Sequence, residues 1–305
     1  MTEHRYADPT ALRRAVTDRL RTLARDRRAQ LADLQRQFAY DRLLSRLFVS
    51  EPDRWVLKGA TALLARLGGA ARHTLDVDLY RPGDSLAEAE AALRAAAASD
   101  LGDFFRFALA PGRRVAEGRD TIRIGVTAYL GATEFAAFHV DLIAGIAMTG
   151  EPDEMRPLVP IDLPGIPAPD YRVYPVADHV ADKLCALIET HPRTTGPAQP
   201  STRYRDLADL VVIAHTQPLR ADHVLRAVVS EARRRRLTLP DNLPTPDTAQ
   251  WRPGYARVAR DVPGLVEQDL DDALVTVRLL VDPILSRTAT GTWDPADLSW
   301  DATAA

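Results

Sequence analysis

The sequence has one cysteine among its 305 residues, no long apolar run and no excess of positive charge. A single cysteine excludes an internal disulfide, so we expect a reducing, cytoplasmic setting. No stretch reaches the roughly 20 apolar residues that a transmembrane helix needs, and the polar start, residues 1–5, predicts no signal peptide. The net charge of −3 excludes a general basic field, so nucleic-acid binding would depend on a local patch.

The length and composition are those of a folded protein with a sizeable core. Hydrophobic residues make up 46% of the chain and charged residues 27%, which is typical of globular domains. A length of 305 residues fits two domains, or one large domain with a satellite. Prolines crowd residues 150–175 and block long helices there. We therefore expect this stretch to connect a first domain, residues 1–170, to a second domain, residues 171–305.

Hydrophobic periodicity predicts an α+β first domain and a helical second domain. Apolar residues at helical spacing predict helix over about 8–50, and Ser85 with Glu88 has the capping-box pattern that begins a helix ending near Ala98. Alternation of apolar and polar residues predicts a strand at 120–130, and we also expect strands at 54–58, 104–109 and 135–143. In the second half we expect helices at 176–189, 203–215, 221–237 and 265–285, a loop at 191–202, and a frayed tail from Ser286 onward.

Two acidic residues, Asp76 and Asp78, stand one residue apart in an apolar, strand-like run. Side chains two apart in a strand point to the same face, so both carboxylates would project together. Adjacent like charges are costly without a cation between them, and Mg²⁺ takes one or two carboxylates plus substrate phosphates. The alternative is a solvated strand edge, but the apolar neighbours Leu75, Val77 and Leu79 favour a sheet interior and a functional pair.

A third carboxylate and a glycine turn extend the pattern. Asp141 lies within the apolar strand at 135–143, where an unpaired charge would be expensive. A metal ion is therefore one expected partner, and Arg123 on the adjacent strand is the structural alternative. Gly59 follows a short strand and precedes a helix, which is an arrangement that points backbone N–H groups at a phosphate. The alternative for Gly59 is a simple turn.

These ordered motifs resemble the polymerase-β type of nucleotidyltransferase superfamily, in which a glycine-rich turn precedes a strand bearing Asp-x-Asp and a neighbouring strand supplies a third carboxylate. More closely, the chain resembles the AbiEii/AbiGii toxin family, including its MenT-like members. The resemblance implies a nucleotidyltransferase-type mixed β-sheet flanked by helices, followed by a C-terminal helical domain. It spans roughly Trp55 to Leu210 and rests on four motifs: Leu57-Lys58-Gly59-Ala60-Thr61-Ala62-Leu63, Arg72-x-Thr74-x-Asp76-x-Asp78-Leu79, Asp182-Lys183-Leu184-x-Ala186 and Arg203-x-x-Asp206-Leu207-x-Asp209-Leu210.

The resemblance also implies which residues would act. The expected metal ligands, in a site for two Mg²⁺ ions, are Asp76, Asp78 and Asp141. The expected catalytic set adds Lys183 and Asp206 to these carboxylates. The expected contacts to the nucleoside triphosphate (NTP) are Lys58, Gly59, Thr61, Lys183 and Arg203.

Several of these residues have an ordinary structural alternative. Lys58 fits a strand-end lysine equally well, and Lys183 could extend along its helix to solvent. Asp206 could pair with arginines on its own helix, which is the role we expect for Asp209. The chain has Ala60 where the superfamily usually has a second Gly or Ser, so a hydroxyl contact to phosphate would come from Thr61 or be absent.

The best local basic patch is the run Arg233, Arg234, Arg235 and Arg236 at a predicted helix end. Consecutive side chains spread around a helix, so two or more of them could reach an RNA phosphate backbone. The alternative is a solvated helix C-terminus, which the helix macrodipole favours. The sequence leaves both interpretations open.

The resemblance implies a toxin of a toxin–antitoxin or phage-defence pair. It would transfer a nucleoside monophosphate (NMP) from an NTP to an RNA acceptor, the tRNA 3′ end, and so block translation. The implied partners are tRNA and a cognate antitoxin, and we expect a monomer. Two alternatives stay open, namely NMP transfer to a protein or small molecule, and a non-catalytic regulator that binds nucleotides or RNA. The preferred NTP and the particular tRNA do not follow from the sequence.

Overall fold

The computed structural model describes residues 6–115, 120–190 and 201–301. The chain forms two compact units. The first consists of Met1–Gly69, His73–Ile146 and Pro152–Val173, and the second of Ala70–Arg72, Ala147–Glu151 and Tyr174–Ala305. Two short segments from the first half of the chain, Ala70–Arg72 and Ala147–Glu151, thus belong to the second unit. The predicted division into residues 1–170 and 171–305 has a single boundary and does not include this exchange of segments. Most of the loop predicted at 191–202 lies outside the described residues.

The first unit is built on a mixed sheet whose strands run in the order β3-β5-β6-β2-β1-β8-β7, with β4 paired to β5. Strands β2 and β6 are parallel, as are β1 and β8, and the other pairs are antiparallel. The proline-rich connector contributes the last two strands. The strands are β1 (Val56–Lys58), β2 (Asp76–Tyr80), β3 (Phe105–Leu109), β4 (Arg113–Arg114), β5 (Thr121–Leu130), β6 (Thr133–Ile143), β7 (Asp153–Met155) and β8 (Tyr171–Val173).

The helices of the first unit are α1 (Pro9–Arg27), α2 (Leu31–Ser50), α3 (Gly59–Leu67) and α4 (Leu86–Ala97). The single helix predicted over 8–50 is two helices, because Arg28 adopts the left-handed conformation with φ 51° and ends α1. The capping box of Ser85 and Glu88 is confirmed at the start of α4. A turn of 3₁₀ helix, Gly68–Ala70, follows α3.

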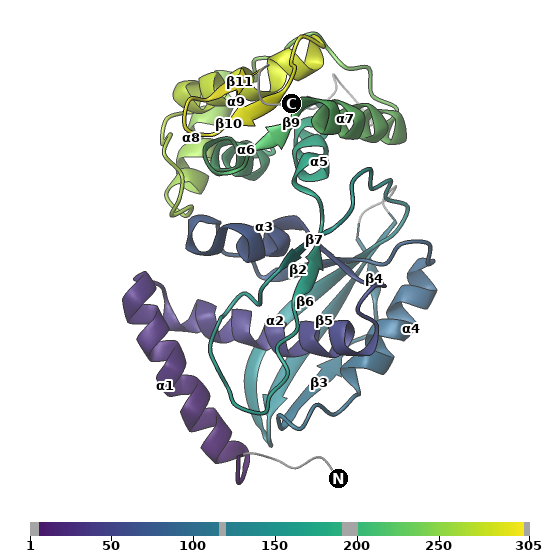
Figure 1. The fold of residues 1–305 in the computed structure, drawn as a ribbon, viewed down its shortest axis with the longest axis vertical. Helices are drawn as coiled ribbons and strands as arrows, with labels where there is room; N and C mark the ends of the chain where they lie inside the picture. Colours follow the sequence, from purple (N-terminus) through teal and green to yellow (C-terminus); the bar gives the residue numbers. More distant parts are fainter. Residues whose placement is uncertain (1–5, 116–119, 191–200, 302–305) are drawn as a thin grey trace. The chain divides into compact units, whose positions relative to one another are not determined.

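One face of the sheet is buried and the other carries charge. Helix α2 crosses the sheet (Figure 1) and packs on β6, where the rings of Tyr40 and Phe138 lie 4.7 Å apart. The side chains that alternate with Asp76, Asp78 and Asp141 on β2 and β6 are almost completely buried, namely Val77, Leu79, Val140 and Leu142. The period of two along each strand therefore places the acidic residues on the face away from α2.

A buried ion-pair network fastens α2 to the start of β3. Asp103 is completely buried and accepts hydrogen bonds from Arg42 Nε at 2.8 Å and from Arg46 Nη2 at 2.7 Å. The Phe105 N–H also donates to Asp103, at 3.0 Å. Two buried guanidinium groups thus share one buried carboxylate, which is the counter-charge of both.

The second unit is mainly helical, with helices α5 (Val176–Ile188), α6 (Tyr204–Thr216), α7 (Ala221–Arg235), α8 (Thr248–Ala259) and α9 (Leu270–Leu285). A small sheet joins them, in the order β11-β10-β9, from β9 (Leu219–Arg220), β10 (Thr292–Asp294) and β11 (Ser299–Asp301). In the described part of the chain, no helix has the length and apolar character needed to span a bilayer.

The prediction of a frayed tail is wrong through Asp301. Trp293 on β10 is completely buried, and its indole N–H donates to the Ala214 carbonyl at 2.8 Å. Trp300 on β11 donates to the Leu280 carbonyl at 3.0 Å. The two indole rings outweigh the small polar residues around them, because a buried aromatic ring removes a large apolar surface from water.

Candidate functional site

Strand register places four charged residues in one row across the sheet. Arg123 on β5 pairs directly with Asp141 on β6, Asp141 pairs with Asp78 on β2, and Asp78 pairs with Lys58 on β1. Directly paired residues share a face, and their Cβ atoms lie about 4.5–5.5 Å apart. The row therefore has a cation at each end and two neighbouring carboxylates between them.

A second row lies beside the first on the same face. His139 on β6 pairs with Asp76 on β2 and with Gly125 on β5. The prediction that Asp76 and Asp78 share a strand face is confirmed by the strand β2. Leu75 is not part of the buried face, because it precedes the strand and its side chain is 56% exposed. The Nδ1 atom of His139 lies 3.6 Å from Oδ1 of Asp76.

Asp141 is held by Arg123. The guanidinium donates from Nε to Oδ1 at 2.8 Å and from Nη2 to Oδ2 at 2.7 Å, and Nη2 lies 3.4 Å from Oδ1 of Asp76. The hydrogen bond to Asp141 raises the pKa of Arg123. The structure thus contains the Arg123 pair that the sequence left as the alternative for Asp141.

The three carboxylates of this face lie in different surroundings. Asp76 and Asp78 project from one strand face and are partly exposed, which suits an ion that takes one or two carboxylates and keeps its waters. Both oxygens of Asp141 already accept from Arg123. Within the described ranges, no group of three or more His, Cys, Asp or Glu side chains is arranged to hold a metal ion.

Gly59 lies against this face at the turn from β1 into α3. Its φ is 59°, in the left-handed region, and a Cβ atom there would overlap Oδ2 of Asp78. The turn therefore requires glycine, both for its backbone conformation and for its closeness to the carboxylate. Lys58, which precedes it, is 7% exposed.

Thr61 has a structural role that the sequence did not predict. Its side chain is completely buried, and its hydroxyl donates to the Asp76 carbonyl at 2.7 Å. That hydrogen bond fastens α3 to the strand that bears the two carboxylates. The predicted contact between Thr61 and phosphate is therefore corrected, because the hydroxyl faces the sheet backbone.

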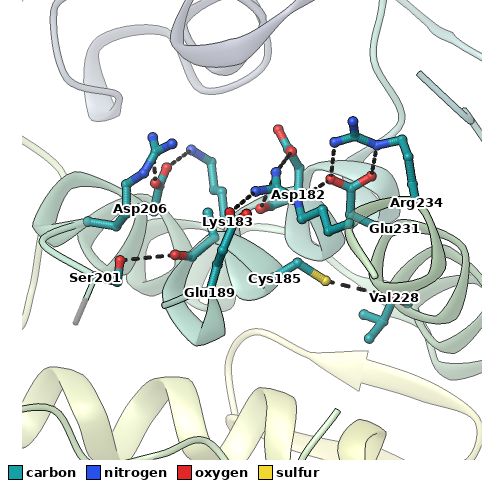
Figure 2. Close-up of polar contacts among 12 residues, drawn as sticks. Asp182, Lys183, Cys185, Glu189, Ser201, Asp206, Val228, Glu231 and Arg234 are labelled. Carbon is teal, nitrogen blue, oxygen red and sulfur yellow. Dashed lines mark hydrogen bonds and ion pairs between the residues drawn. The ribbon is translucent and has the colours of Figure 1, made fainter. Parts of the chain in front are cut away.

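The second unit contains its own charged cluster, centred on Lys183 of α5. Its Nζ lies 2.5 Å from Oδ2 of Asp209 and 3.2 Å from Oδ1 of Asp206, both on α6, and Figure 2 shows the contact with Asp206. Burial would lower the pKa of Lys183, but the two carboxylates outweigh it and raise the pKa, so the lysine is charged. Lys183 is not a lysine extending to solvent, since it is 6% exposed.

Asp209 is the partner that sequence reasoning undervalued. It is 3% exposed, and besides Lys183 it accepts from Arg72 Nε at 3.2 Å. Asp206 in turn lies 3.4 Å from Nη1 of Arg203. The signal was the spacing, because residues three apart on a helix share a face and both aspartates could therefore meet one lysine.

Two of the four arginines in the run, Arg234 and Arg235, pair with carboxylates of the same unit. Arg234 makes two hydrogen bonds to Glu231, at 2.7 and 2.6 Å (Figure 2). Arg235 pairs with three carboxylates, those of Asp182, Glu189 and Glu231. Arg233 and Arg236 are exposed, and neither forms an ion pair with any described residue. Two of the four cations are thus committed within the fold.

Cys185 is buried on α5, and its Sγ lies 4.0 Å from the Val228 carbonyl (Figure 2). Burial raises the pKa of the thiol to about 12, so thiolate is scarce near neutral pH.

We expect Ellman's reagent to label Cys185 in the native protein roughly 100-fold or more slowly than in the urea-unfolded protein. The absorbance time course measures this, and rapid labelling of the native chain would contradict the buried placement.

The predicted site residues therefore fall into two groups. The first unit brings together Lys58, Gly59, Asp76, Asp78 and Asp141, and the second brings together Lys183, Arg203 and Asp206. Sequence reasoning gave little weight to three further residues, which contact one group or the other: Arg123, His139 and Asp209.

Comparison with known proteins identifies the fold. The profile of the family described as nucleotidyl transferase AbiEii toxin, type IV TA system, matches residues 42–276. MenT4, a nucleotidyltransferase toxin from Mycobacterium tuberculosis, is 20% identical with a TM-score of 0.55, over 88% of this chain and 89% of that one. An H. pylori protein classed as a nucleotidyltransferase gives 15% identity and a TM-score of 0.42, over 81% and 93% of the two chains. No curated protein matches the sequence.

Proposed function

Because the chain belongs to the AbiEii nucleotidyltransferase toxin family, we propose that it transfers NMP from an NTP to the 3′ end of tRNA and thereby blocks translation. The observation that supports this proposal most directly is the pair Asp76 and Asp78, on one strand face beside the turn at Gly59. A partly exposed acidic face next to a glycine turn suits a polyphosphate accompanied by a cation.

The proposed reaction is an in-line displacement. The acceptor 3′-hydroxyl oxygen attacks the α-phosphorus, the bond from that phosphorus to the bridging oxygen breaks, and pyrophosphate leaves with the electron pair. The hydroxyl proton passes to solvent. Asp76 and Asp78 are the residues that would hold Mg²⁺, which when bound supplies positive charge to the phosphate oxygens. The protein itself mainly positions the two reactants.

The NTP contacts are proposed on the family resemblance and on charge. Gly59 allows a phosphate to approach the backbone at the start of α3, where N–H groups are available. Lys183 and Arg203 are the cations assigned to the triphosphate, and Asp206 with Asp209 would orient Lys183. Lysine binds phosphate as a compact point charge. Lys58, on β1 opposite Asp78, is a further proposed contact.

For the acceptor, tRNA is the proposed substrate and the exposed Arg233 and Arg236 are the cations available to its backbone. The acceptor stem is recognised through shape and backbone, so few cations suffice. As a member of a toxin family the chain implies a cognate antitoxin. Action in the cytoplasm as a monomer, and a role in phage defence, complete the proposal.

The test is to incubate the protein with each α-labelled NTP, Mg²⁺ and total tRNA. Label on tRNA that requires Mg²⁺ and is absent from an Asp78→Asn control is the expected result. Label on protein or on a small molecule would instead favour a different acceptor. A chain that binds NTP without transferring label would be a non-catalytic relative, and the proposal would fail.

The turn at Gly59 allows a prediction for a single substitution. Gly59→Ala introduces a methyl group into the space of Asp78 and forces alanine into the left-handed region. We expect a loss of about 1–2 kcal/mol of stability from the backbone alone and a fall in transfer of about 100-fold as Asp78 is displaced. Gly83→Ala is the matched control, because Gly83 has φ 81° and no atom near its added Cβ. Equal activity in the two variants would contradict the assigned closeness to Asp78.

A further inference from the structure

The acidic face is the sheet face that carries Asp76, Asp78 and Asp141, and the position of Arg123 affects how many metal ions this face can hold. Arg123 and Asp141 are directly paired on antiparallel strands, so the guanidinium reaches its carboxylate from a fixed backbone position. Both oxygens of Asp141 accept from it, at 2.8 and 2.7 Å. This is the planar two-point pairing that arginine makes with carboxylates, and it is stronger and more directional than a single contact.

A second divalent ion would need the oxygens that Arg123 already occupies. Two-metal sites place their ions about 3.5–4 Å apart, which on this face requires Asp141 to share ligation with Asp76 or Asp78. The Nη2 atom of Arg123 lies between these groups, 2.7 Å from Asp141 and 3.4 Å from Asp76. An ion at that position would displace the guanidinium or be repelled by it.

The charge of the face also suits one ion. It carries three carboxylates, Asp76, Asp78 and Asp141, against two cations, Lys58 and Arg123. One divalent ion already makes the net charge of the face positive. A second ion would add positive charge beside Arg123, which is held in place by Asp141. The side chain of Arg123 is 35% exposed, so its outer edge remains open to a bound anion.

We propose that Arg123 takes the place of a second metal ion. The face binds one divalent cation through Asp76 and Asp78, and Arg123 supplies a fixed positive charge at Asp141. The inference rests on the proposed function for the identity of the ion as a reaction cofactor. Its test depends on ion binding alone.

Titration with Mn²⁺, followed by electron paramagnetic resonance of the nucleotide-free protein, tests this inference. We expect one ion per wild-type chain and none in Asp76→Asn/Asp78→Asn. Arg123→Gln removes the guanidinium and frees Asp141, so this variant is expected to bind a second ion and to give the broadened spectrum of a coupled Mn²⁺ pair. The double variant Arg123→Gln/Asp141→Asn should return to one ion.

Three results would overturn the inference, and the first two concern the second ion. One is a wild-type chain that binds a coupled pair of ions and loses one of them in Asp141→Asn, and the other is an Arg123→Gln chain that still binds one. Circular dichroism melting checks that each variant is folded. If Arg123→Gln does not fold, the wild type and Asp141→Asn decide the question. One bound ion without nucleotide transfer would refute the proposed function and leave this inference standing. A wild-type chain that transfers label but binds no Mn²⁺ in this titration would refute this inference and leave the proposed function standing.

Discussion

Asp76→Asn is expected to lower nucleotide transfer by about 10³-fold or more, since a metal ion supplies several kcal/mol of charge stabilisation. Asp76 is the carboxylate of the second row, and both Arg123 and His139 lie within 4 Å of its oxygen. Asparagine keeps the shape of the side chain and removes only its charge. Initial rates of α-label incorporation at saturating NTP measure the effect.

Asp26→Asn is the matched control for that experiment. Asp26 is an exposed carboxylate on α1 of the same unit, so its loss should leave transfer within about twofold of the wild type, as surface substitutions usually do. Melting curves of both variants should match the wild type. A folded Asp76→Asn protein with wild-type rates would contradict the proposal that the acidic face takes part in nucleotide transfer.

Asp103→Asn is expected to cost about 3–5 kcal/mol of stability in the first unit, because it leaves two buried guanidinium groups without their counter-charge. Arg42 and Arg46 are 2% and 0% exposed, so neither can turn to water without opening the contact between α2 and β3. Urea unfolding followed by circular dichroism measures the change. Asp222→Asn is the control, since that carboxylate is 56% exposed and exposed pairs contribute roughly 0–1 kcal/mol.

The same carboxylate predicts a pH dependence. Burial opposes ionisation of Asp103, but the hydrogen bond from Arg46 and the charges of both arginines outweigh it and lower the pKa. A group whose pKa is lowered by folding stabilises the protein above its ordinary pKa, and this stability is lost as the pH falls through the folded value. The difference between wild type and Asp103→Asn should therefore be full at neutral pH and shrink in acid. A difference that grew in acid would contradict the ion-pair assignment.

Local sequence patterns were sufficient to predict that acidic residues share one face of the sheet, but not which side chains pair with them. The period of two in β2 placed Asp76 and Asp78 together, and the apolar run around Asp141 predicted a strand. The family resemblance implied that this strand lies beside the one that bears Asp76 and Asp78. Register between strands far apart in the sequence decides which groups pair, and a single sequence does not specify it. The pairing of Arg123 with Asp141 was therefore one of two open alternatives until the strands were aligned.

Tertiary context explains the other differences. The tail as far as Asp301 forms two strands, in which Trp293 and Trp300 donate to carbonyls on α6 and α9. The local composition of the tail does not indicate these partners. The arginine run loses two of its charges to carboxylates, some of them distant in the chain, such as Asp182. The hydroxyl of Thr61 donates to the backbone carbonyl of Asp76. Sequence spacing alone does not reveal that a side chain has a backbone partner, so this contact was not predicted.

The most direct test of the account compares two positions of the label in the same NTP. With tRNA and Mg²⁺, label on the α-phosphate should appear on tRNA, and label on the γ-phosphate should leave with pyrophosphate, because displacement at the α-phosphorus retains only the NMP. Transfer of the γ-label to tRNA, or failure of the α-label to reach any acceptor, would contradict the assignment of this chain as a nucleotidyltransferase.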